Sequence, residues 1–303
     1  MTFLKRIKKN KTVTDIRRYL VYIVSVTSCF IVRILPWKVV VKAGKALGLF
    51  AFYIVRYAKK RSTDNLTRVF GEERSAGEIR LIAKNVYKNM GITSLEFAKM
   101  PHMTDDEFFA ATDYKKEQID YLWELLNHKK GVIFASAHMG NWEMLAEFGS
   151  RLGFNMSILF KPSTNPYLNK IWFGLRGNNK LIDISKDLSS VVRRLRANEV
   201  ICLLFDENAR KRGIMLDFFG KPASTYKGPA YFALKTGCPV VCLYFVRKKE
   251  DAKHKFIIER TIWPKRTGNL EKDMLDILRQ MNESLEQVIR QYPEQWNWIY
   301  KRW

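Results

Sequence analysis

The chain has 303 residues, of which 47% are hydrophobic, and its 53 lysines and arginines against 30 acids give a net charge of +23. This length and apolar fraction suffice for one large domain, with or without an appendage, and exclude a disordered polypeptide. The charge is uneven, because residues 1–61 hold 15 of the basic residues and one acid, Asp15, for a net charge of +14. This asymmetry predicts an anionic partner for the N-terminal part, either a membrane surface or a nucleic acid.

The N-terminal part carries an apolar stretch between basic clusters. Residues 5–11 hold five lysines and arginines, Tyr19 to Val32 is free of charge, and Lys59-Lys60-Arg61 ends the region. A helix over the 14 residues from Tyr19 to Val32 is roughly 21 Å long, shorter than a bilayer core of about 30 Å. The pattern favours a membrane anchor, spanning the bilayer or lying in its interface, over a buried core helix or a signal peptide. The basic head indicates a cytoplasmic N-terminus.

Beyond residue 60 the pattern becomes globular, so we expect an anchoring segment over 1–60 and a domain over 61–303. Amphipathic spacing predicts helices over 76–100 and 115–128. Helical patterns then alternate with short apolar runs, and the predicted helices are 144–152, 166–176, 187–197, 226–236 and 270–292. The runs predicted as strands are Val132–Ala135, Met156–Phe160, Leu181–Ile184, Val200–Phe205, Val240–Val246 and Phe256–Ile262, the last two as an antiparallel hairpin. This alternation predicts an α/β fold with a mostly parallel central sheet flanked by helices.

The stretch from Ala137 to Glu143 places a histidine and a carboxylate five residues apart, between a predicted strand and a predicted helix. Five residues of regular helix turn through about 500°, so His138 and Glu143 can meet only if the chain turns between them. Gly140 permits that turn, and Asn141 can cap the helix that follows. His138 then lies at the carboxyl end of a strand, where open α/β sheets bind ligands. Glu143 can accept the proton of one imidazole nitrogen and leave the other as a general base, with the free amides of the turn near an oxyanion.

Other kinds of catalytic site find no support in the sequence. The histidines, which form no HExxH motif and no cluster with cysteines, are His102, His128, His138 and His254. The cysteines, expected as buried reduced thiols of a cytosol-facing domain, are Cys29, Cys202, Cys238 and Cys242. No nucleophile elbow, phosphate-binding loop or dinucleotide fingerprint is present. Two interpretations of His138 therefore stand: a general base acting on a substrate hydroxyl, or a structural histidine.

Several motifs together carry a resemblance to a known family. The HxxxxE pair within SAHMGNWE resembles the HxxxxD/E motif of the glycerolipid (lysophospholipid) acyltransferase superfamily, and is most similar to its lipid A late acyltransferases, which transfer lauroyl and myristoyl chains. Further matching stretches are Arg61-x-x-x-Asn65-Leu66 with Phe70, Met90-Gly91 with Glu96, Lys161-Pro162 to Asn165-Pro166, Arg176-Gly177, LLFDENA, LDFFGKPASTYKGPA, KTGCPVV, and Tyr292-Pro293-Glu294-Gln295-Trp296-x-Trp298 with Arg302-Trp303. Two positions depart from the pattern: Glu207 stands where many members have glutamine, and Lys161 where arginine is common.

This resemblance implies a membrane-associated O-acyltransferase whose catalytic domain is 61–303. His138 is expected to activate a hydroxyl of a lipid A precursor for attack on an acyl thioester of acyl carrier protein or coenzyme A, with Glu143 as its partner. The acceptor is expected to be an anionic glycolipid, and no metal, organic cofactor or nucleic acid is implied. The expected location is the bacterial inner membrane, with the catalytic domain on the cytoplasmic face.

Four more residues receive roles from the resemblance, each beside a simpler interpretation. Asn141 is expected to support the oxyanion or the turn, or to act only as a helix cap. Lys161 and Arg176 suit the binding of a phosphate, and the alternative is solvated surface charge. Asp206, at the end of the predicted strand Val200–Phe205, either completes the polar site or holds a loop.

Two alternative functions stay open at the level of sequence. The first is the same chemistry on another glycolipid or aminolipid acceptor, such as a phosphatidylinositol mannoside. The second is a non-enzymatic basic protein that binds a membrane or a nucleic acid, although no nucleic-acid-binding motif is present.

Overall fold

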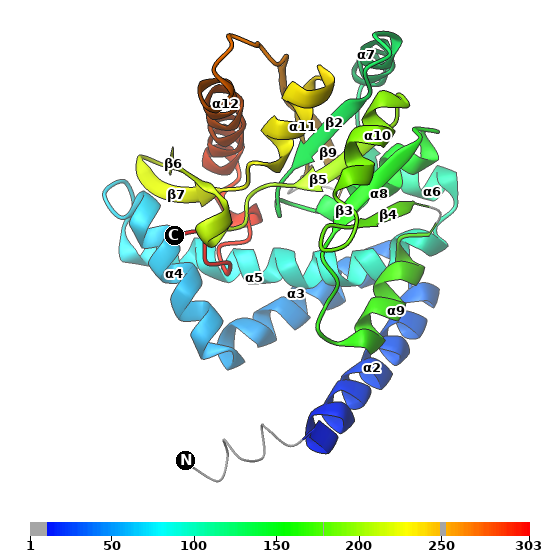
Figure 1. The fold of residues 1–303 in the computed structure, drawn as a ribbon. Helices are drawn as coiled ribbons and strands as arrows, with labels where there is room; N and C mark the ends of the chain where they lie inside the picture. Colours follow the sequence, from blue (N-terminus) through cyan, green and yellow to red (C-terminus); the bar gives the residue numbers. More distant parts are fainter. Residues whose placement is uncertain (1–10, 178, 249–252) are drawn as a thin grey trace.

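The structure of the chain is a computed structural model that describes residues 11–177, 179–248 and 253–303. The strands, labelled in Figure 1, are β1 (Thr112–Asp113), β2 (Val132–Ser136), β3 (Met156–Phe160), β4 (Lys180–Asp183), β5 (Val200–Leu204), β6 (Ile214–Phe218), β7 (Lys221–Thr225), β8 (Val240–Arg247) and β9 (His254–Ile262). The helices are α2 (Lys11–Ile34), α3 (Trp37–Ile54), α4 (Arg56–Phe70), α5 (Ala76–Lys99), α6 (Asp105–Ala110), α7 (Lys116–Asn127), α8 (Trp142–Arg151), α9 (Pro166–Leu175), α10 (Ser189–Arg196), α11 (Gly228–Thr236) and α12 (Leu270–Gln291). Short 3₁₀ turns are η1 (Met100–His102), η2 (Arg210–Arg212) and η3 (Pro293–Gln295).

The central sheet has seven strands in the order β1-β9-β8-β2-β5-β3-β4. Strands β8, β2, β5, β3 and β4 run parallel, and β8 pairs antiparallel with β9. Every residue of β2 and of β8 is buried, as expected for strands covered on both faces. The predicted α/β fold with a mostly parallel sheet is therefore confirmed, together with the predicted β8–β9 hairpin.

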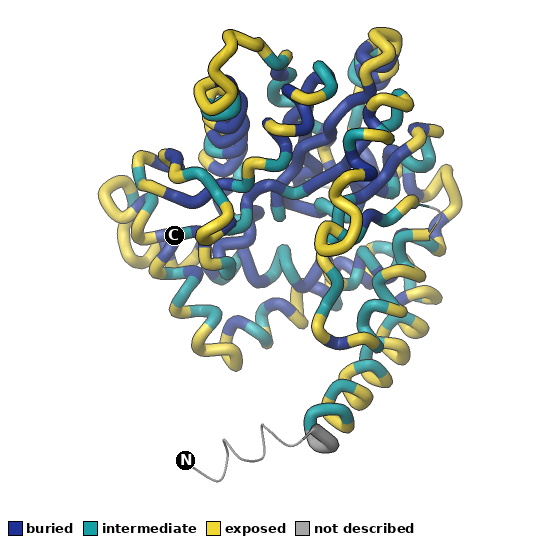
Figure 2. The backbone as a smooth tube through the Cα atoms, viewed as in Figure 1, coloured by how far each residue is buried: buried dark blue, intermediate teal, exposed yellow. Residues whose placement is uncertain are grey.

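Helices cover both faces of this sheet, and alternate residues of each strand enter different cores. Ile133 and Ala135 of β2 pack with α10, α11 and α12 on one face. Val132 and Phe134 pack with α7 and α8 on the other face. Figure 2 shows the resulting buried centre under partly exposed helices. Successive side chains of a strand point to opposite faces of the sheet, so neighbouring residues of β2 enter different cores.

One hairpin was not predicted from the sequence. Strands β6 and β7 pair antiparallel with Phe218 opposite Lys221, which leaves a two-residue turn. Both turn residues, Phe219 and Gly220, have positive φ, at 55° and 66°. Asn or Asp before Gly is the usual sequence signal for such a turn. Phe219 takes that position here, so the sequence lacks the signal that would predict the hairpin.

Helix α3 lies tightly against α5 through glycines on both helices. A Cβ atom built on Gly48 would lie 2.0 Å from the carbonyl oxygen of Tyr87, and one on Gly44 would lie 2.5 Å from the Cα of Ile92. A Cβ on Gly91 of α5 would lie 2.3 Å from the carbonyl oxygen of Gly44. The two backbones are therefore closer than any larger residue permits.

The N-terminal helices leave much apolar surface uncovered. Helix α2 projects along one side of the molecule beside α9 (Figure 1), and most of its residues are exposed. Within the described parts of the chain, no helix combines the length and the apolar character that crossing a membrane requires. This finding corrects the spanning form of the expected anchor. The physical reason is charge, because Arg33 follows the apolar run of α2, and Lys42 and Lys45 interrupt α3.

Candidate active site

The predicted turn between strand and helix is present between β2 and α8. Gly140 has a φ of 56°, which favours glycine, and a Cβ there would lie 1.8 Å from the carbonyl oxygen of Phe245. Asn141 caps α8, since its side-chain oxygen accepts a hydrogen bond from the Met144 amide (3.2 Å). The turn thus places His138 just past the carboxyl end of β2.

The C-terminal segment holds this turn in place. The amide of Asn297 donates to the carbonyl of His138 (2.9 Å), and the amide of Gly140 donates to the carbonyl of Gln295 (2.9 Å). From the other side, the Thr93 hydroxyl of α5 donates to the carbonyl of Gly140 (3.0 Å). Hydrogen bonds to two segments distant in sequence, the C-terminal segment and α5, therefore fix the position of His138.

The imidazole of His138 bonds to Asp206, which follows β5. Nδ1 of His138 lies 2.9 Å from Oδ1 of Asp206, and the main-chain amide of His138 donates to Oδ2 (3.0 Å). The indole of Trp296 also donates to Oδ2 (2.8 Å). A carboxylate only accepts, so Nδ1 carries the proton and Nε2 presents its lone pair. Nε2 has no hydrogen-bond partner among the described residues, and 12% of the His138 side chain is exposed.

Charges around the imidazole set its proton affinity. Burial lowers the pKa of His138, but the Asp206 carboxylate, with smaller contributions from Glu207 and Glu143, outweighs burial and raises it above its ordinary value. Burial raises the pKa of Asp206, and its bonds to His138 and Trp296 reverse this, so that carboxyl stays ionised. The arrangement stabilises an imidazolium and holds one tautomer of the neutral ring.

Glu143 does not form the hydrogen bond to His138 that the sequence predicts. Its carboxylate accepts two bonds from the Arg176 guanidinium, at 2.8 and 3.1 Å, and one from the Trp142 indole (3.3 Å). The physical reason is that Glu143 lies in the first turn of α8 and faces α9, whereas Asp206 extends from the neighbouring strand. Glu143 therefore acts on His138 through its charge alone.

The remaining predicted residues are divided between the site and its surroundings. Arg176 ends α9 and is brought to the site by its ion pair with Glu143. The Asn141 side chain is completely buried, so it cannot contact a substrate directly. Lys161 is exposed just after β3 and forms no hydrogen bond or ion pair with the described residues.

Sequence reasoning missed the aromatic residues that surround His138. The rings of Tyr300 and Trp142 contact its imidazole edge to face, with centroids 4.6 and 5.1 Å away. Trp296 and Trp298 are buried, and Trp296 bonds Asp206, so these two tryptophans pack inside the protein. The C-terminal motif that begins at Tyr292 was the signal available in the sequence, because it contains Trp296 and precedes Tyr300. Aromatic rings around the imidazole limit the access of water to it.

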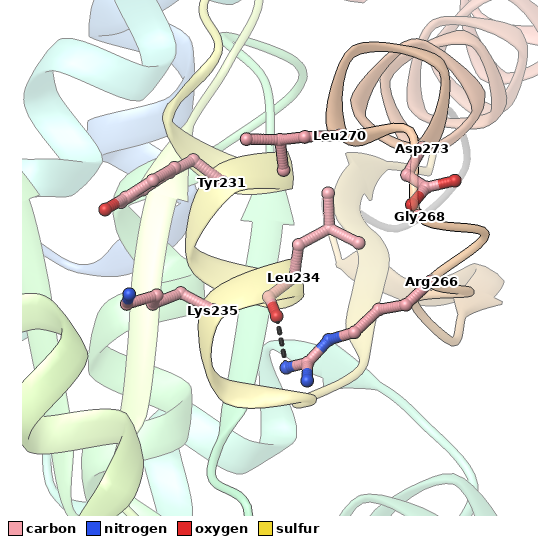
Figure 3. Close-up of a pocket in the computed structure, with 7 residues that line it drawn as sticks. All are labelled: Tyr231, Leu234, Lys235, Arg266, Gly268, Leu270 and Asp273. Atoms are coloured by element: carbon pink, nitrogen blue, oxygen red, sulfur yellow. Dashed lines mark hydrogen bonds between the residues drawn. The ribbon is translucent and has the colours of Figure 1, made fainter.

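A separate cavity of about 310 Å³ lies between α11 and the beginning of α12 (Figure 3). Its lining residues are Tyr231, Leu234, Lys235, Arg266, Gly268, Leu270 and Asp273, and Arg266 donates to the carbonyl of Leu234. The segment that contains Arg266 follows the end of β9, where Ile262 pairs with the first residue of β8, Val240. The cavity is therefore near the amino ends of the parallel strands, at the opposite edge from His138.

Known proteins match the chain over almost its whole length. A family model described as bacterial lipid A biosynthesis acyltransferase matches residues 7–303. The lipid A biosynthesis lauroyltransferase of Escherichia coli K12 is 24% identical over 276 residues, which cover 88% of this chain and 86% of that one. The lipid A biosynthesis myristoyltransferase of the same strain is 23% identical over 260 residues, covering 84% and 78%. The phosphatidylinositol mannoside acyltransferase of Mycolicibacterium smegmatis is 24% identical over 205 residues, covering 61% and 60%.

Proposed function

The chain belongs to the family of bacterial lipid A biosynthesis acyltransferases, and we propose that it moves a fatty acyl chain from an acyl thioester to a hydroxyl of a lipid A precursor, with His138 as the general base. One observation carries the assignment of the base: Nδ1 of His138 is bonded to the buried Asp206, which leaves Nε2 free for a substrate proton. Asp206 thereby takes the orienting role that the sequence assigns to Glu143.

This geometry supports the following course of the reaction. Nε2 of His138 takes the proton of the acceptor hydroxyl as its oxygen attacks the thioester carbonyl. Asp206 stabilises the imidazolium that forms. The tetrahedral oxyanion collapses, the carbon–sulfur bond breaks, and the leaving thiolate takes the proton from the imidazolium. The ester and a free thiol are the products, and the histidine returns to its neutral form.

Glu143 and Arg176 contribute charge beside the reacting groups. Glu143 raises the pKa of His138 without touching the ring, so it supports the imidazolium. Arg176 holds Glu143, and together with Lys161 it supplies positive charge for a phosphorylated substrate. The first-turn amides of Trp142 and Glu143 have no acceptor within α8, and we assign them to the stabilisation of the oxyanion.

The donor and the membrane are proposed from charge and exposed surface. A net charge of +23 fits an acyl carrier protein or coenzyme A as donor, and an anionic lipid as acceptor. Large apolar side chains are exposed along α2 and the outer face of α3, including Leu20, Val24, Phe30 and Phe50. We place this surface in the interface of the bacterial inner membrane, with the catalytic domain on its cytoplasmic face.

A second acceptor class is favoured by one observation. The relative from Mycolicibacterium smegmatis is a phosphatidylinositol mannoside acyltransferase, which shows that similar chains act on a different glycolipid. Mass spectrometry of lipids from cells that lack the protein distinguishes the two acceptors. A missing acyl ester on lipid A supports the first, and a missing ester on another glycolipid supports the second.

The role of the base is tested with purified protein. His138→Ala is expected to lower acyl transfer at least about 100-fold, because the base and the imidazolium are both lost. Transfer of a labelled acyl chain from carrier-protein and coenzyme A thioesters to the lipid is measured, with thermal unfolding as the check on folding. His102→Ala, at an exposed histidine, is the matched control. Near-normal turnover in His138→Ala contradicts the mechanism.

A further inference from the structure

A second polar cluster lies entirely inside the protein behind the catalytic turn. The carboxylate of Glu96, from α5, accepts two bonds from the Arg247 guanidinium at the end of β8, one of them at 2.7 Å. Nε2 of His254, the first residue of β9, lies 2.9 Å from Nη1 of Arg247 and 3.2 Å from Oε1 of Glu96. Glu96 and His254 are completely buried, and Arg247 is 7% exposed. None of the three belongs to the dyad of His138 and Asp206.

The cluster is a neutralised ion pair beside an uncharged imidazole. Burial raises the pKa of Glu96, but Arg247 outweighs it and holds the pKa well below its usual range. Burial lowers the pKa of His254, and Glu96 offsets this only in part. The imidazole is therefore neutral and accepts from Arg247 through Nε2. Nδ1 of His254 and Nε of Arg247 stay without partners among the described residues.

The cluster reaches the catalytic turn through Asn141. The Asn141 amide nitrogen donates to Oε2 of Glu96 (2.9 Å), and its oxygen accepts from the Met144 amide (3.2 Å). Because an ionised carboxylate has no proton to donate, the nitrogen must face Glu96 and the oxygen must face the helix. Glu96 thus determines the orientation of the residue that caps α8.

The same arginine is tied to the segment that holds His138. The Arg247 amide donates to the side-chain oxygen of Gln295 (2.7 Å), and the side-chain nitrogen of Gln295 donates to the Arg247 carbonyl (2.8 Å). The carbonyl of Gln295 in turn accepts from the Gly140 amide (2.9 Å). Two consecutive residues of the turn between β2 and α8, Gly140 and Asn141, are therefore connected to one buried ion pair.

Stability alone does not account for such a cluster. Replacing a buried ion pair by apolar residues of similar volume is often neutral or even stabilising. Buried pairs that persist are best attested where they specify one arrangement of the chain. Here the ion pair would specify the conformation of the turn between β2 and α8.

We infer that Glu96 is a positioning residue for catalysis: held by Arg247, it orients Asn141 and so fixes the first turn of α8 relative to His138. Glu96 does not contact the substrate, since it is completely buried. The inference rests on the proposed function only for its catalytic consequence, because the geometry of the turn can be measured without a substrate. Displacement of reacting groups by about 1 Å lowers rates by up to about 100-fold.

Asn141→Ser tests the link without adding a charge. Serine caps a helix about as well as asparagine but is too short to reach Glu96. We expect kcat to fall about 10- to 100-fold with KM within about twofold, at a temperature where the variant is fully folded. Hydrogen exchange of the peptide over 137–145 is expected to be faster than in the unmodified protein. Asn269→Ser is the matched control, because exposed Asn269 caps α12 through the Lys272 amide and should change neither measurement.

A reciprocal pair of substitutions tests Glu96 itself. Glu96→Gln alone leaves Arg247 without its counter-charge, and Asn141→Asp alone places two carboxylates together. In the double variant the glutamine amide donates to the aspartate, which restores the hydrogen bond with its direction reversed and the charge of the cluster unchanged. We expect the double variant to recover at least about tenfold of the kcat lost in Glu96→Gln.

The outcomes separate this inference from the proposed function. A kcat for Asn141→Ser within twofold of the control, or a double variant no better than its singles, overturns the positioning role. A loss of activity that follows only the fraction of unfolded protein overturns it as well. If the unmodified protein transfers no acyl chain, the proposed function fails, and the exchange rates of 137–145 still decide whether Glu96 fixes the turn.

Discussion

Two carboxylates flank His138, and they differ in how they act on it. Asp206 accepts a hydrogen bond from Nδ1 directly. Glu143 is bonded to Arg176 and affects the imidazole only through the electrostatic effect of its charge. Both raise the pKa of His138, with Asp206 contributing more. As the proposed base, His138 must be neutral, so activity is expected to be lost as pH falls through its raised pKa, at a higher pH than for an ordinary histidine.

Asp206→Asn removes the partner that raises this pKa and leaves the burial that lowers it. The acidic limb of kcat/KM is therefore expected to move to lower pH. The plateau is expected to fall by about 100- to 10,000-fold, because the ring loses its tautomer and the imidazolium loses its counter-charge. Measuring the pH dependence of kcat/KM tests both effects.

Glu143→Gln is the informative comparison for the acidic limb of the pH dependence of kcat/KM. Its carboxylate does not touch the imidazole, so we expect a smaller shift to lower pH than in Asp206→Asn. A larger shift in Glu143→Gln would make Glu143 the partner of the base, as the HxxxxE spacing first indicates.

At the scale of elements, the close contact of α3 with α5 makes a stability prediction. A Cβ at Gly48 meets the Tyr87 carbonyl at 2.0 Å, so Gly48→Ala must separate the helices. We expect a loss of about 1–3 kcal/mol in the free energy of unfolding, measured by denaturant titration.

Gly174→Ala, inside α9, is the matched control for this contact. A Cβ there meets nothing within 4 Å, and alanine favours a helix over glycine by about 0.5–1 kcal/mol. The control should therefore be neutral or stabilising. Equal effects of the two substitutions would show that the glycines of α3 are not needed for packing.

At the scale of the whole molecule, charge and apolar surface coincide. Residues 1–61 carry a net charge of +14, and α2 and α3 present exposed apolar side chains. We expect this surface to bind anionic bilayers through both electrostatic attraction and the burial of its apolar side chains. The α2 side lies away from the beginning of α12, at the opposite end of the molecule in Figure 1.

Phe30→Glu, at a side chain 65% exposed on α2, is expected to lower binding to anionic vesicles about tenfold. Leu270→Glu, at a side chain 55% exposed at the beginning of α12, adds the same charge and should change binding little. Co-sedimentation with vesicles at two salt concentrations measures the difference. Equal losses in the two variants would indicate that only net charge matters.

The sequence alone determined most elements of the domain, although not the β6–β7 hairpin. The strand Met156–Phe160 and the helix from residue 166 were predicted to within one residue, because apolar periodicity reports burial directly. Gly140 and Asn141 marked the catalytic turn, since a positive φ and a helix cap each restrict the residue type.

Only the tertiary structure decided which carboxylate meets His138. Strands β2 and β5 are neighbours although β3 and β4 separate them in sequence, and Ser136 pairs with Leu204. His138 and Asp206 each follow two residues after that pair, so they lie side by side. The order of parallel strands is set by how helices pack on the sheet, which local periodicity does not encode. The histidine can therefore be predicted from its own segment. Its partner, Asp206, lies 68 residues later in the sequence and is brought to it by the pairing of β2 with β5.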